Sequence, residues 1–339
     1  MSRHGHFSLA VWPCFVVLAC ILLVLGCQDG SGPNLVTSPE GEPTFDGVKP
    51  PPPPPPQPPA DPAIAFSITG RVRDGRGWRT ATFLKVMNAD GTNLTSIYMT
   101  PAGQGLGWRP AWSPDGHCIA FTIGGSPNPG IYFIDVSVVN GVPTGTNLRL
   151  FQPSPAWMPA WSPDGTRIAY MFDTSPTTNE LRVAPVSGGP AEILYYSAYG
   201  ALDPSWSPDG MKIAFAEDPF GIRVLDLTDM TVTTVVPYEE GWSRGDPSWA
   251  RTQDALVFDG EASGAWADLY IKQLPSGTPT LVCSGSMPDW SPDDQALVFR
   301  GEGSSSYSLY RIELATGIIT RLMSGGGEDH PAYPAWRRF

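Results

Sequence analysis

The chain has 339 residues, and 21 Lys and Arg stand against 33 Asp and Glu, which gives a formal net charge of −12 at pH 7. This acidic balance argues against a nucleic-acid partner, because binding to phosphate needs basic side chains. It is typical of a soluble surface or of a protein with a basic partner. The 37 glycines and 38 prolines indicate a chain with many turns.

The first 26 residues have the pattern of an export signal. Arg3 precedes an apolar run from Leu9 to Gly26, and the run ends in Val-Leu-Gly-Cys. This ending resembles the lipobox of bacterial lipoproteins, so Cys27 is predicted to be the lipid-modified first residue of the mature protein. An uncleaved membrane anchor is the alternative, because about 17–25 apolar residues can span a bilayer. The predicted location is the bacterial cell envelope, where the anchored protein faces the periplasm or the cell exterior.

A polar linker rich in glycine and proline follows over residues 27–62. It contains seven consecutive prolines, Pro50–Pro56, which favour an extended polyproline II conformation of about 3.1 Å per residue. A docking site for an SH3-like domain is the alternative. We expect the linker to act as a stiff spacer that holds the following domain away from the membrane.

Residues 63–339 contain a sequence repeat. The string Pro-Ala-Trp-Ser-Pro-Asp-Gly occurs twice, a close variant occurs once and two altered copies follow, at 110–116, 159–165, 204–210, 247–253 and 288–294. The tryptophan of each copy, here called the marker tryptophan, recurs every 41–49 residues: Trp112, Trp161, Trp206, Trp249, Trp290 and, in a final Pro-Ala-Trp, Trp336. The period lies near the about 40–45 residues of one four-stranded propeller blade.

Each repeat reads as a set of short strands. Ser-Pro-Asp-Gly places its residues where a type I turn favours them, so the string predicts a corner between two strands. An aromatic residue lies nine positions after the marker tryptophan in five copies: Phe121, Tyr170, Phe215, Phe258 and Phe299. Two further runs rich in β-branched and aromatic residues complete a unit, for example 130–136 with 148–151. No long apolar pattern of period 3.6 follows the signal, which indicates an all-β fold.

The two ends of the repeat region complement each other. The last Pro-Ala-Trp, at 334–336, has no hairpin partner after it, whereas the strand at 63–66 has no such string before it. Pairing the C-terminal strand with residues 64–68, followed by strands at 83–91 and 94–99, makes one blade from both termini. Ring closure of this kind protects strand edges. We therefore predict an all-β, six-bladed β-propeller with four-stranded blades, one of them closed by strands from both termini.

Two cysteines lie within the repeats, Cys118 in the first full copy and Cys283 in the fourth. Three blades apart in a ring of six means opposite sides, which exceeds the roughly 7 Å Cα separation that a disulfide tolerates. We predict two unpaired thiols.

These units resemble the repeats of the TolB-type β-propeller, the WD40-like PD40 repeats of the periplasmic protein of the Tol-Pal envelope system. The resemblance rests on Trp-Ser-Pro-Asp-Gly followed by Ile-Ala-Phe and Gly-Ile-Tyr-Phe-Ile-Asp-Val, in three full and three partial motifs over about residues 63–339. It implies the fold, whereas propellers host many unrelated activities. TolB also carries an N-terminal α/β domain, which this chain is expected to lack because a signal and a linker precede the blades.

Catalytic patterns are sparse. His117 and His330 are the only histidines after the signal, and neither a metal-binding histidine spacing nor a G-x-S-x-G nucleophile motif occurs. His330 approaches the last strand beside Glu328 and Asp329, where a structural loop is weighed against a metal or acid-base role. We predict no catalytic residue, no metal site and no cofactor, and we rank an enzyme below a binding protein.

Comparison of the copies points to a candidate site just before the repeated string. Proline stands two residues before each marker tryptophan, and the residue between them is small except at Asp289. In the family this strand is the innermost one, so the side chains one step earlier are expected to ring the channel mouth. These candidate binding residues, with His330 added, are Arg109, Met158, Asp203, Asp246, Met287, Tyr333 and His330. We expect Trp108, Trp157 and Trp242, in the leading loops, to back the ring. The alternative is a mouth that is simply solvated.

The predicted function is a lipid-anchored cell-envelope β-propeller that binds a protein or peptide segment at one face. The alternative is a polysaccharide-active enzyme, a lyase or hydrolase, with its site at the channel mouth and with Asp203, Asp246 and His330 as candidates. A purely structural stalk is the third possibility.

Overall fold

The computed structural model describes residues 63–338 apart from 76, 102–103, 107–108, 126, 240–241, 263–265, 303–306 and 327–329. The regular secondary structure of these described residues consists of β-strands alone. The predicted signal peptide, the lipidated Cys27 and the linker lie outside the described residues. Among the residues described, none forms a helix long and apolar enough to cross a membrane.

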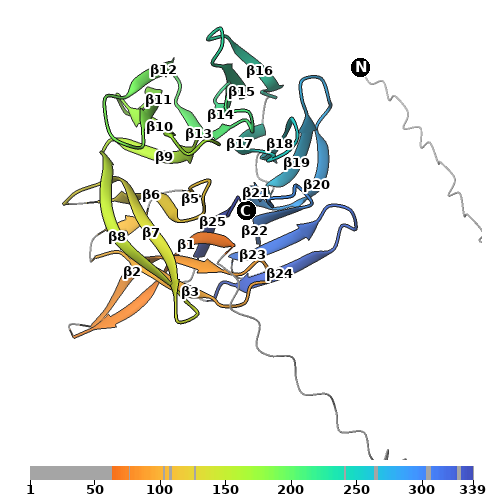
Figure 1. The fold of residues 1–339 in the computed structure, drawn as a ribbon. Helices are drawn as coiled ribbons and strands as arrows, with labels where there is room; N and C mark the ends of the chain where they lie inside the picture. Colours follow the sequence, from red (N-terminus) through yellow and green to blue (C-terminus); the bar gives the residue numbers. More distant parts are fainter. Residues whose placement is uncertain are drawn as a thin grey trace, which may run out of the picture. The chain divides into compact units, whose positions relative to one another are not determined.

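The strands form six sheets around a common centre, here named blades 1 to 6 and given from the innermost strand outward (Figure 1). Blade 1 contains β25 (His330–Trp336), β1 (Ile64–Asp74), β2 (Gly77–Met87) and β3 (Thr95–Met99). Blade 2 contains β4 (Gly105–Leu106) and β5 (Ala111–Trp112), which both pair with β6 (Cys118–Gly124), then β7 (Gly130–Val139) and β8 (Val142–Pro153). Blade 3 contains β9 (Ala156–Trp161), β10 (Arg167–Asp173), β11 (Asn179–Pro185) and β12 (Glu192–Ser197). Blade 4 contains β13 (Ala201–Trp206), β14 (Lys212–Glu217), β15 (Gly221–Asp226) and β16 (Val232–Pro237). Blade 5 contains β17 (Trp242–Trp249), β18 (Ala255–Ala262), β19 (Asp268–Gln273) and β20 (Thr280–Ser284). Blade 6 contains β21 (Ser286–Trp290), β22 (Ala296–Glu302), β23 (Tyr307–Glu313) and β24 (Ile319–Ser324).

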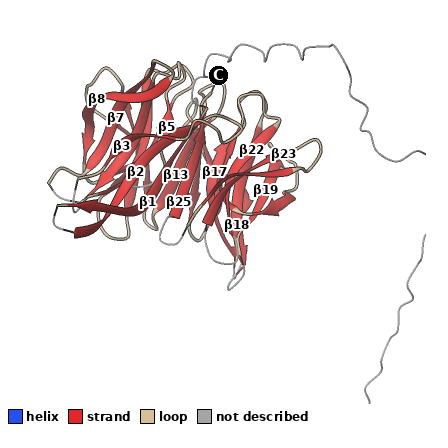
Figure 2. Cartoon of the chain, turned by 90° about the horizontal axis from the view of Figure 1, so that it is seen from below, coloured by secondary structure: helices blue, strands red, loops and turns tan. Residues whose placement is uncertain are grey.

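Blade 1 is built from both ends of the described chain. Its innermost strand β25 pairs antiparallel with β1, so that Ile64 lies opposite Trp336 and Ala65 lies opposite Ala335. Seen after a 90° turn, the strands of neighbouring blades stand beside one another (Figure 2). These observations confirm the predicted all-β, six-bladed propeller with one blade shared by the termini.

Two hairpins are longer than the sequence patterns predicted. The β1–β2 hairpin continues to Asp74 and Gly77, and the β7–β8 hairpin continues to a turn at Asn140 and Gly141 with φ of +51° and +80°. Positive φ at both central residues is the geometry of a type I′ turn. The extension was not predicted because it carries little buried surface: Val139, at its tip, is 53% exposed.

The apolar core lies between the blades. Six clusters of buried side chains each combine residues from two neighbouring blades, and one of them joins Leu84 and Val86 of blade 1 to Ile119 and Phe121 of blade 2. Burial of apolar area contributes about 25 cal/mol per Å². Each blade is therefore stabilised chiefly by its two neighbours, which makes closure of the ring part of the fold.

The marker tryptophans join one blade to the next, and all six are at most 5% exposed. Three of them donate from the indole Nε1 to the carbonyl oxygen of the small residue in the preceding blade at 3.0–3.1 Å: Trp161 to Ala111, Trp206 to Ala160 and Trp290 to Ser248. The tryptophan therefore stabilises the contact between blades, which explains why it persists in copies that have lost the corner residues.

The Ser-Pro-Asp-Gly corners have the predicted turn. The carbonyl oxygen of Ser113 accepts from the backbone N of Gly116 at 2.9 Å. The Ser113 hydroxyl donates to Oδ1 of Asp115 at 2.5 Å and accepts from the backbone N of Cys118 at 2.9 Å. The serine and aspartate of the repeated string therefore act within the corner.

Blade 5 has lost these corner residues, and blade 6 supplies a replacement. Asp294 stands where the full copies have glycine, keeps a φ of +56° and is 4% exposed. Its carboxylate accepts from the backbone N of Arg251 at 2.7 Å, from the backbone N of Thr252 at 2.8 Å and from the Thr252 hydroxyl at 2.6 Å. The altered copy in blade 6 therefore compensates for the lost corner residues of blade 5.

Cys118 in blade 2 and Cys283 in blade 5 are unpaired, which confirms the prediction of two free thiols. Burial is the main cause that raises the pKa of Cys118 to about 12 and the pKa of Cys283 to about 11. Both thiols stay protonated at neutral pH and are poor nucleophiles.

Candidate functional site

In five blades the innermost strand contains a β-bulge just before the repeated proline, and in blade 2 it is divided at this place into β4 and β5. In blade 3 the register shifts between Ala169 and Met171 of β10, so Met158 and Pro159 of β9 together oppose one residue. The six equivalent residues share a φ between +45° and +56°: Arg109, Met158, Asp203, Asp246, Met287 and Tyr333. A left-handed φ costs a non-glycine residue about 1–2 kcal/mol. Because all copies share it, this strain belongs to the blade architecture, and only the side chain differs between copies.

Three of these side chains converge from separate blades at the centre of the ring. Nε of Arg109 lies 3.6 Å from Oδ1 of Asp203 and 3.5 Å from Oδ1 of Asp246, and its Nη1 donates to the carbonyl oxygen of Pro247 at 3.4 Å. Arg109 belongs to blade 2 and Asp246 to blade 5, on the opposite side of the ring (Figure 1). The side chains of Arg109, Asp203 and Asp246 are 17%, 9% and 14% exposed. We call this end of the central channel the mouth.

A third carboxylate, Asp259 of β18, joins the group. Its Oδ2 accepts from the backbone N of Met287 at 3.0 Å. Burial, followed by the charge of Asp246, raises the pKa of Asp259 well above its ordinary value. Burial and then Asp246 also raise the pKa of Asp203 to about 7, against the opposing charge of Arg109. Among the described residues, these three carboxyl groups surround the guanidinium of Arg109, so this cluster is negative when the carboxyls are ionised.

Two carboxylate oxygens at the mouth lack a hydrogen-bond donor among the described residues. They are Oδ1 of Asp203 and Oδ1 of Asp246, both buried. Their contacts with Arg109, at 3.5–3.6 Å, are longer than a hydrogen bond. An unsatisfied buried polar atom costs about 1–3 kcal/mol, more when charged. A cationic donor that reaches these oxygens would therefore be stabilised there, and a shared proton is the substitute when none is present.

Two of the remaining ring residues, Met158 and Tyr333, are less exposed to solvent than side chains on the surface around the mouth. Met158 is 8% exposed, packs in the core between blades 3 and 4, and accepts the backbone N–H of Asp203 on its sulfur at 3.4 Å. Tyr333 is half-buried. Burial, then the charges of Asp246 and Asp203, raise the pKa of its hydroxyl, which stays protonated. These residues line the interior of the mouth.

His330 does not join this group. It is exposed at the start of β25, and its ring lies edge-on to Tyr307 with 5.7 Å between centroids. Its strand partner is Thr69 of β1. Glu328 and Asp329, which the sequence places beside it, lie outside the described residues.

The tryptophans expected in the leading loops belong to strands instead. Trp157 is in β9 and pairs with Met171, whereas Trp242 begins β17 and pairs with Ala262. The loop prediction was wrong for these two because antiparallel pairing extends to the residues on the N-terminal side of the bulge. Trp108 lies outside the described residues.

The central channel holds a cavity of about 70 Å³ between the mouth and the end beside the Ser-Pro-Asp-Gly corners, here called the turn end. Arg109 lines one side, and the small residues and three of the marker tryptophans, Trp112, Trp161 and Trp336, line the wall. Pockets for drug-sized ligands occupy about 300–1,000 Å³, so the cavity has room for a side chain or a small group. No group of three His, Cys, Asp or Glu among the described residues is placed to hold a metal ion.

Asp259 was missed in the sequence. It follows the buried Phe258, in a strand whose other central residues are apolar. The equivalent positions carry Thr122, Met171, Ala216 and Arg300. A carboxylate inside an otherwise apolar second strand was the signal that would have found it.

Solved structures similar to this chain share its fold. The TolB of Acinetobacter baumannii has 18% sequence identity and a TM-score of 0.65, over 81% of this chain and 66% of that chain. The putative TolB of Agrobacterium tumefaciens has 14% identity and a TM-score of 0.54, over 81% of this chain and 98% of that chain. A chain in the nidogen/laminin complex has 10% identity and a TM-score of 0.56, over 81% and 98% of the two chains.

At these identities the likeness shows the fold alone, and this chain spans less than two thirds of the Acinetobacter protein. A search of the curated proteins found no match. A family model described as PD40, the TolB beta propeller domain, matches residues 145–334, which is more than half of the chain. The chain therefore belongs to the family of the TolB β-propeller domain.

Proposed function

We propose that this protein is a binding module that takes a protein or peptide segment at the mouth. The observation that carries the proposal is the buried pair Asp203 and Asp246, each with an Oδ1 that has no hydrogen-bond donor among the described residues. A lysine or arginine side chain of the partner, or its amino terminus, supplies both the donor and the positive charge. The guanidinium of Arg109 carries one positive charge and leaves the three carboxyls around it incompletely balanced when they are ionised.

The loops at the same end suit a protein partner. Tyr199, Phe220 and Trp266 lie in the connections β12–β13, β14–β15 and β18–β19, which antiparallel pairing places at the mouth. Their exposed fractions are 61%, 38% and 71%. Tyr199 and Phe220 contact edge to face, with 5.4 Å between centroids. Aromatic side chains are enriched at protein interfaces, so these loops offer apolar contacts around a cation-accepting centre.

The location of the binding module is part of the proposal. The Val-Leu-Gly-Cys string and the proline-rich spacer support a lipid anchor at Cys27 and a place in the bacterial cell envelope. Cells that express the full chain and are fed radioactive palmitate are expected to label the wild type and not Cys27→Ala. Label retained by Cys27→Ala would overturn the anchor.

One observation favours a second function, a polysaccharide-active enzyme. The pKa of Asp203, raised to about 7 beside Asp246, is that of a carboxyl able to donate a proton at neutral pH. The cavity of about 70 Å³ is too small to enclose a sugar ring together with the groups that would have to contact it. Its size therefore favours binding of a side chain over turnover of a polysaccharide. A screen of glycans and polyuronides with the full chain separates the two, because any turnover lost in Asp203→Asn would establish the enzyme.

A peptide array tests the binding proposal directly. Full chain is applied to peptides that carry or lack lysine and arginine, and hits are measured in solution by fluorescence polarisation. The double variant Asp203→Asn with Asp246→Asn is expected to bind at least about tenfold more weakly, because charge-assisted hydrogen bonds are lost.

The matched control removes the same charge from two corners at the turn end, Asp164→Asn with Asp209→Asn. It is expected to keep the affinity of the wild type. Equal loss in both double variants would mean that only net charge matters, and no loss in either would remove the mouth as the site.

A further inference from the structure

At the turn end of the channel, three residues depart from the pattern that the other copies share. The residue two positions after the marker tryptophan is proline in four copies and arginine in the other two, Arg251 and Arg338. The residue before the marker tryptophan is small in five copies and is Asp289 in the sixth. These three residues come from blades 5, 1 and 6, which are consecutive in the ring, and all three line the same cavity.

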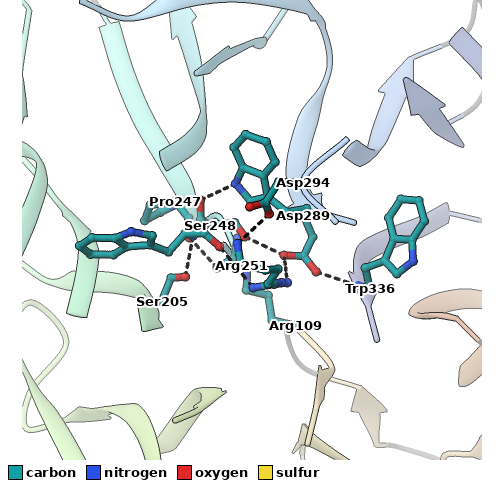
Figure 3. A network of polar contacts seen from close by, with 10 residues as sticks. Arg109, Ser205, Pro247, Ser248, Arg251, Asp289, Asp294 and Trp336 are labelled. Carbon is teal, nitrogen blue, oxygen red and sulfur yellow. Dashed lines mark hydrogen bonds and ion pairs between the residues drawn. The ribbon is translucent and has the colours of Figure 1, made fainter. Parts of the chain in front are cut away.

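Asp289 already has its partners. Its Oδ1 accepts from the Ser248 hydroxyl and from Nη2 of Arg251, both at 2.7 Å, and its Oδ2 accepts from the backbone N of Trp336 at 2.7 Å (Figure 3). The side chains of Arg251 and Asp289 are 10% and 15% exposed. This ion pair fixes one guanidinium at the cavity and neutralises its charge.

Arg338 is left over. It is half-buried and makes no hydrogen bond or ion pair with any residue that the structure describes. Burial, followed by the like charge of Arg251, lowers the pKa of Arg338 to about 9, while Asp289 opposes the shift. Nε of Arg251 is also buried without a hydrogen-bond partner in the described chain. Among the residues that line the cavity at this end, the two guanidiniums face the single carboxylate of Asp289, so one guanidinium has no ion-pair partner there and offers unused N–H donors.

We propose that the turn end of the channel binds a carboxylate group between the guanidiniums of Arg338 and Arg251. Planar guanidinium groups match the two oxygens of a carboxylate. The one guanidinium of the cavity lining that has no ion-pair partner balances a monoanion, whereas it undercompensates a doubly charged phosphate. A cavity of about 70 Å³ exceeds the roughly 10–15 Å³ that one water needs, so it admits a small carboxylate-bearing group. The site uses none of the mouth carboxylates and is independent of the binding proposed there.

Chemical protection of Arg338 tests the site. The full chain is treated with phenylglyoxal in sodium acetate, phosphate or chloride at equal ionic strength, and modification of each arginine is followed by peptide mass spectrometry. Acetate at four times its Kd is expected to slow modification of Arg338 about fivefold by mass action, and to leave the exposed Arg321 of β24 unchanged. Equal rates in acetate and chloride would remove the site, and stronger protection by phosphate would overturn the carboxylate assignment.

Variants separate charge from fold. Acetate is expected to raise the melting temperature of the wild type above its value in chloride, and Arg338→Gln is expected to lose that shift. Asp289→Asn, which removes the balancing charge, is expected to enlarge it, and Arg321→Gln serves as the matched surface control. Arg338→Lys, which keeps the charge, is expected to retain part of the shift and covers the case in which Arg338→Gln fails to fold. An undiminished shift in Arg338→Gln would contradict the proposal.

Discussion

At the scale of single residues, aspartate plays two opposite roles in this chain. In the mouth, burial raises the pKa of Asp203 to about 7, with the charge of Asp246 adding to it. In the corner of blade 3, the Ser162 hydroxyl and the backbone N–H of Thr166 lower the pKa of Asp164. Ionisation of Asp203 costs free energy in the folded protein, whereas hydrogen bonds stabilise the ionised form of Asp164. The fold therefore keeps Asp203 at a position where its ionisation costs free energy, as expected of a residue that has a role in binding.

The cost at Asp203 predicts a pH dependence. Its folded pKa, about 7, lies above the unfolded value of 3.8, so the folded state binds more protons and the free energy of unfolding rises as pH falls from about 7 to about 4. Asp203→Asn cannot ionise and is expected to be more stable than the wild type at pH 8, by up to about 4 kcal/mol, and equal to it near pH 4. Urea unfolding at both pH values measures this.

Asp164→Asn is the matched control for that prediction. Its folded pKa is lowered, so its contribution is present above pH 3.8 and is lost as pH falls through the folded pKa. This variant is expected to be less stable than the wild type at pH 8. If Asp203→Asn also loses stability at pH 8, the mouth carboxylate is not under strain.

At the scale of elements, the corners show how one repeat repairs another. The turn of blade 5 lacks the serine and aspartate that hold the other corners, and Asp294 of blade 6 takes over by accepting three hydrogen bonds from Arg251 and Thr252. This exchange explains why an aspartate occupies a left-handed position that glycine fills elsewhere.

Restoring the repeat pattern at this corner is expected to harm the protein. Asp294→Gly relieves a φ of +56° but removes the three hydrogen bonds from a buried carboxylate. Because hydrogen bonds to charged groups contribute about 1.5–3 kcal/mol each and the relieved strain is about 1–2 kcal/mol, a net loss of at least about 2.5 kcal/mol is expected. Chemical denaturation measures it, and a variant as stable as the wild type would show that the corner of blade 5 needs no partner.

At the scale of the whole molecule, closure of the ring by β25 and β1 joins the two ends of the described chain. Each blade has most of its core in contact with neighbours, so opening the ring exposes two blade faces at once. Closure is therefore where the stability of the propeller is most sensitive.

A pair of engineered disulfides tests this sensitivity. Ala65 and Ala335 lie opposite each other across the closure, and Ala111 and Ala120 lie opposite each other within blade 2. Replacing each pair by cysteines closes a long loop in the first case and a short one in the second. Loop entropy predicts stabilisation of about 5 and about 3 kcal/mol respectively, read from unfolding with and without reductant. If the disulfide across the closure stabilises the protein less than the disulfide within blade 2, closure is not the most sensitive part of the propeller.

Much of this fold was predictable because the repeated residues show which positions of the six copies are equivalent. Proline and tryptophan align the copies, and the mismatch between the two ends of the repeat region predicts the shared blade. The same alignment selects the six left-handed positions, Arg109 and Asp203 among them. The alignment marks Asp259 and Asp294 as departures from the pattern, but it could not give their partners, because these lie in other blades and only the assembled ring brings them together. The altered copies, which look like decay in the sequence, carry the contacts that distinguish the two ends of the channel.

Photo-cross-linking in the native envelope tests directly whether a partner binds at the mouth. A benzoylphenylalanine replaces Tyr199, which lies in the loop leading to Asp203, and in a control it replaces Met230 in the β15–β16 turn at the opposite end. Binding at the mouth predicts that position 199 captures one partner through a segment bearing lysine or arginine. It also predicts that Asp203→Asn with Asp246→Asn lowers the yield at least about fivefold, and that position 230 does not capture this partner. No capture at position 199, or capture that is unchanged when both carboxylates are removed, would contradict binding at the mouth.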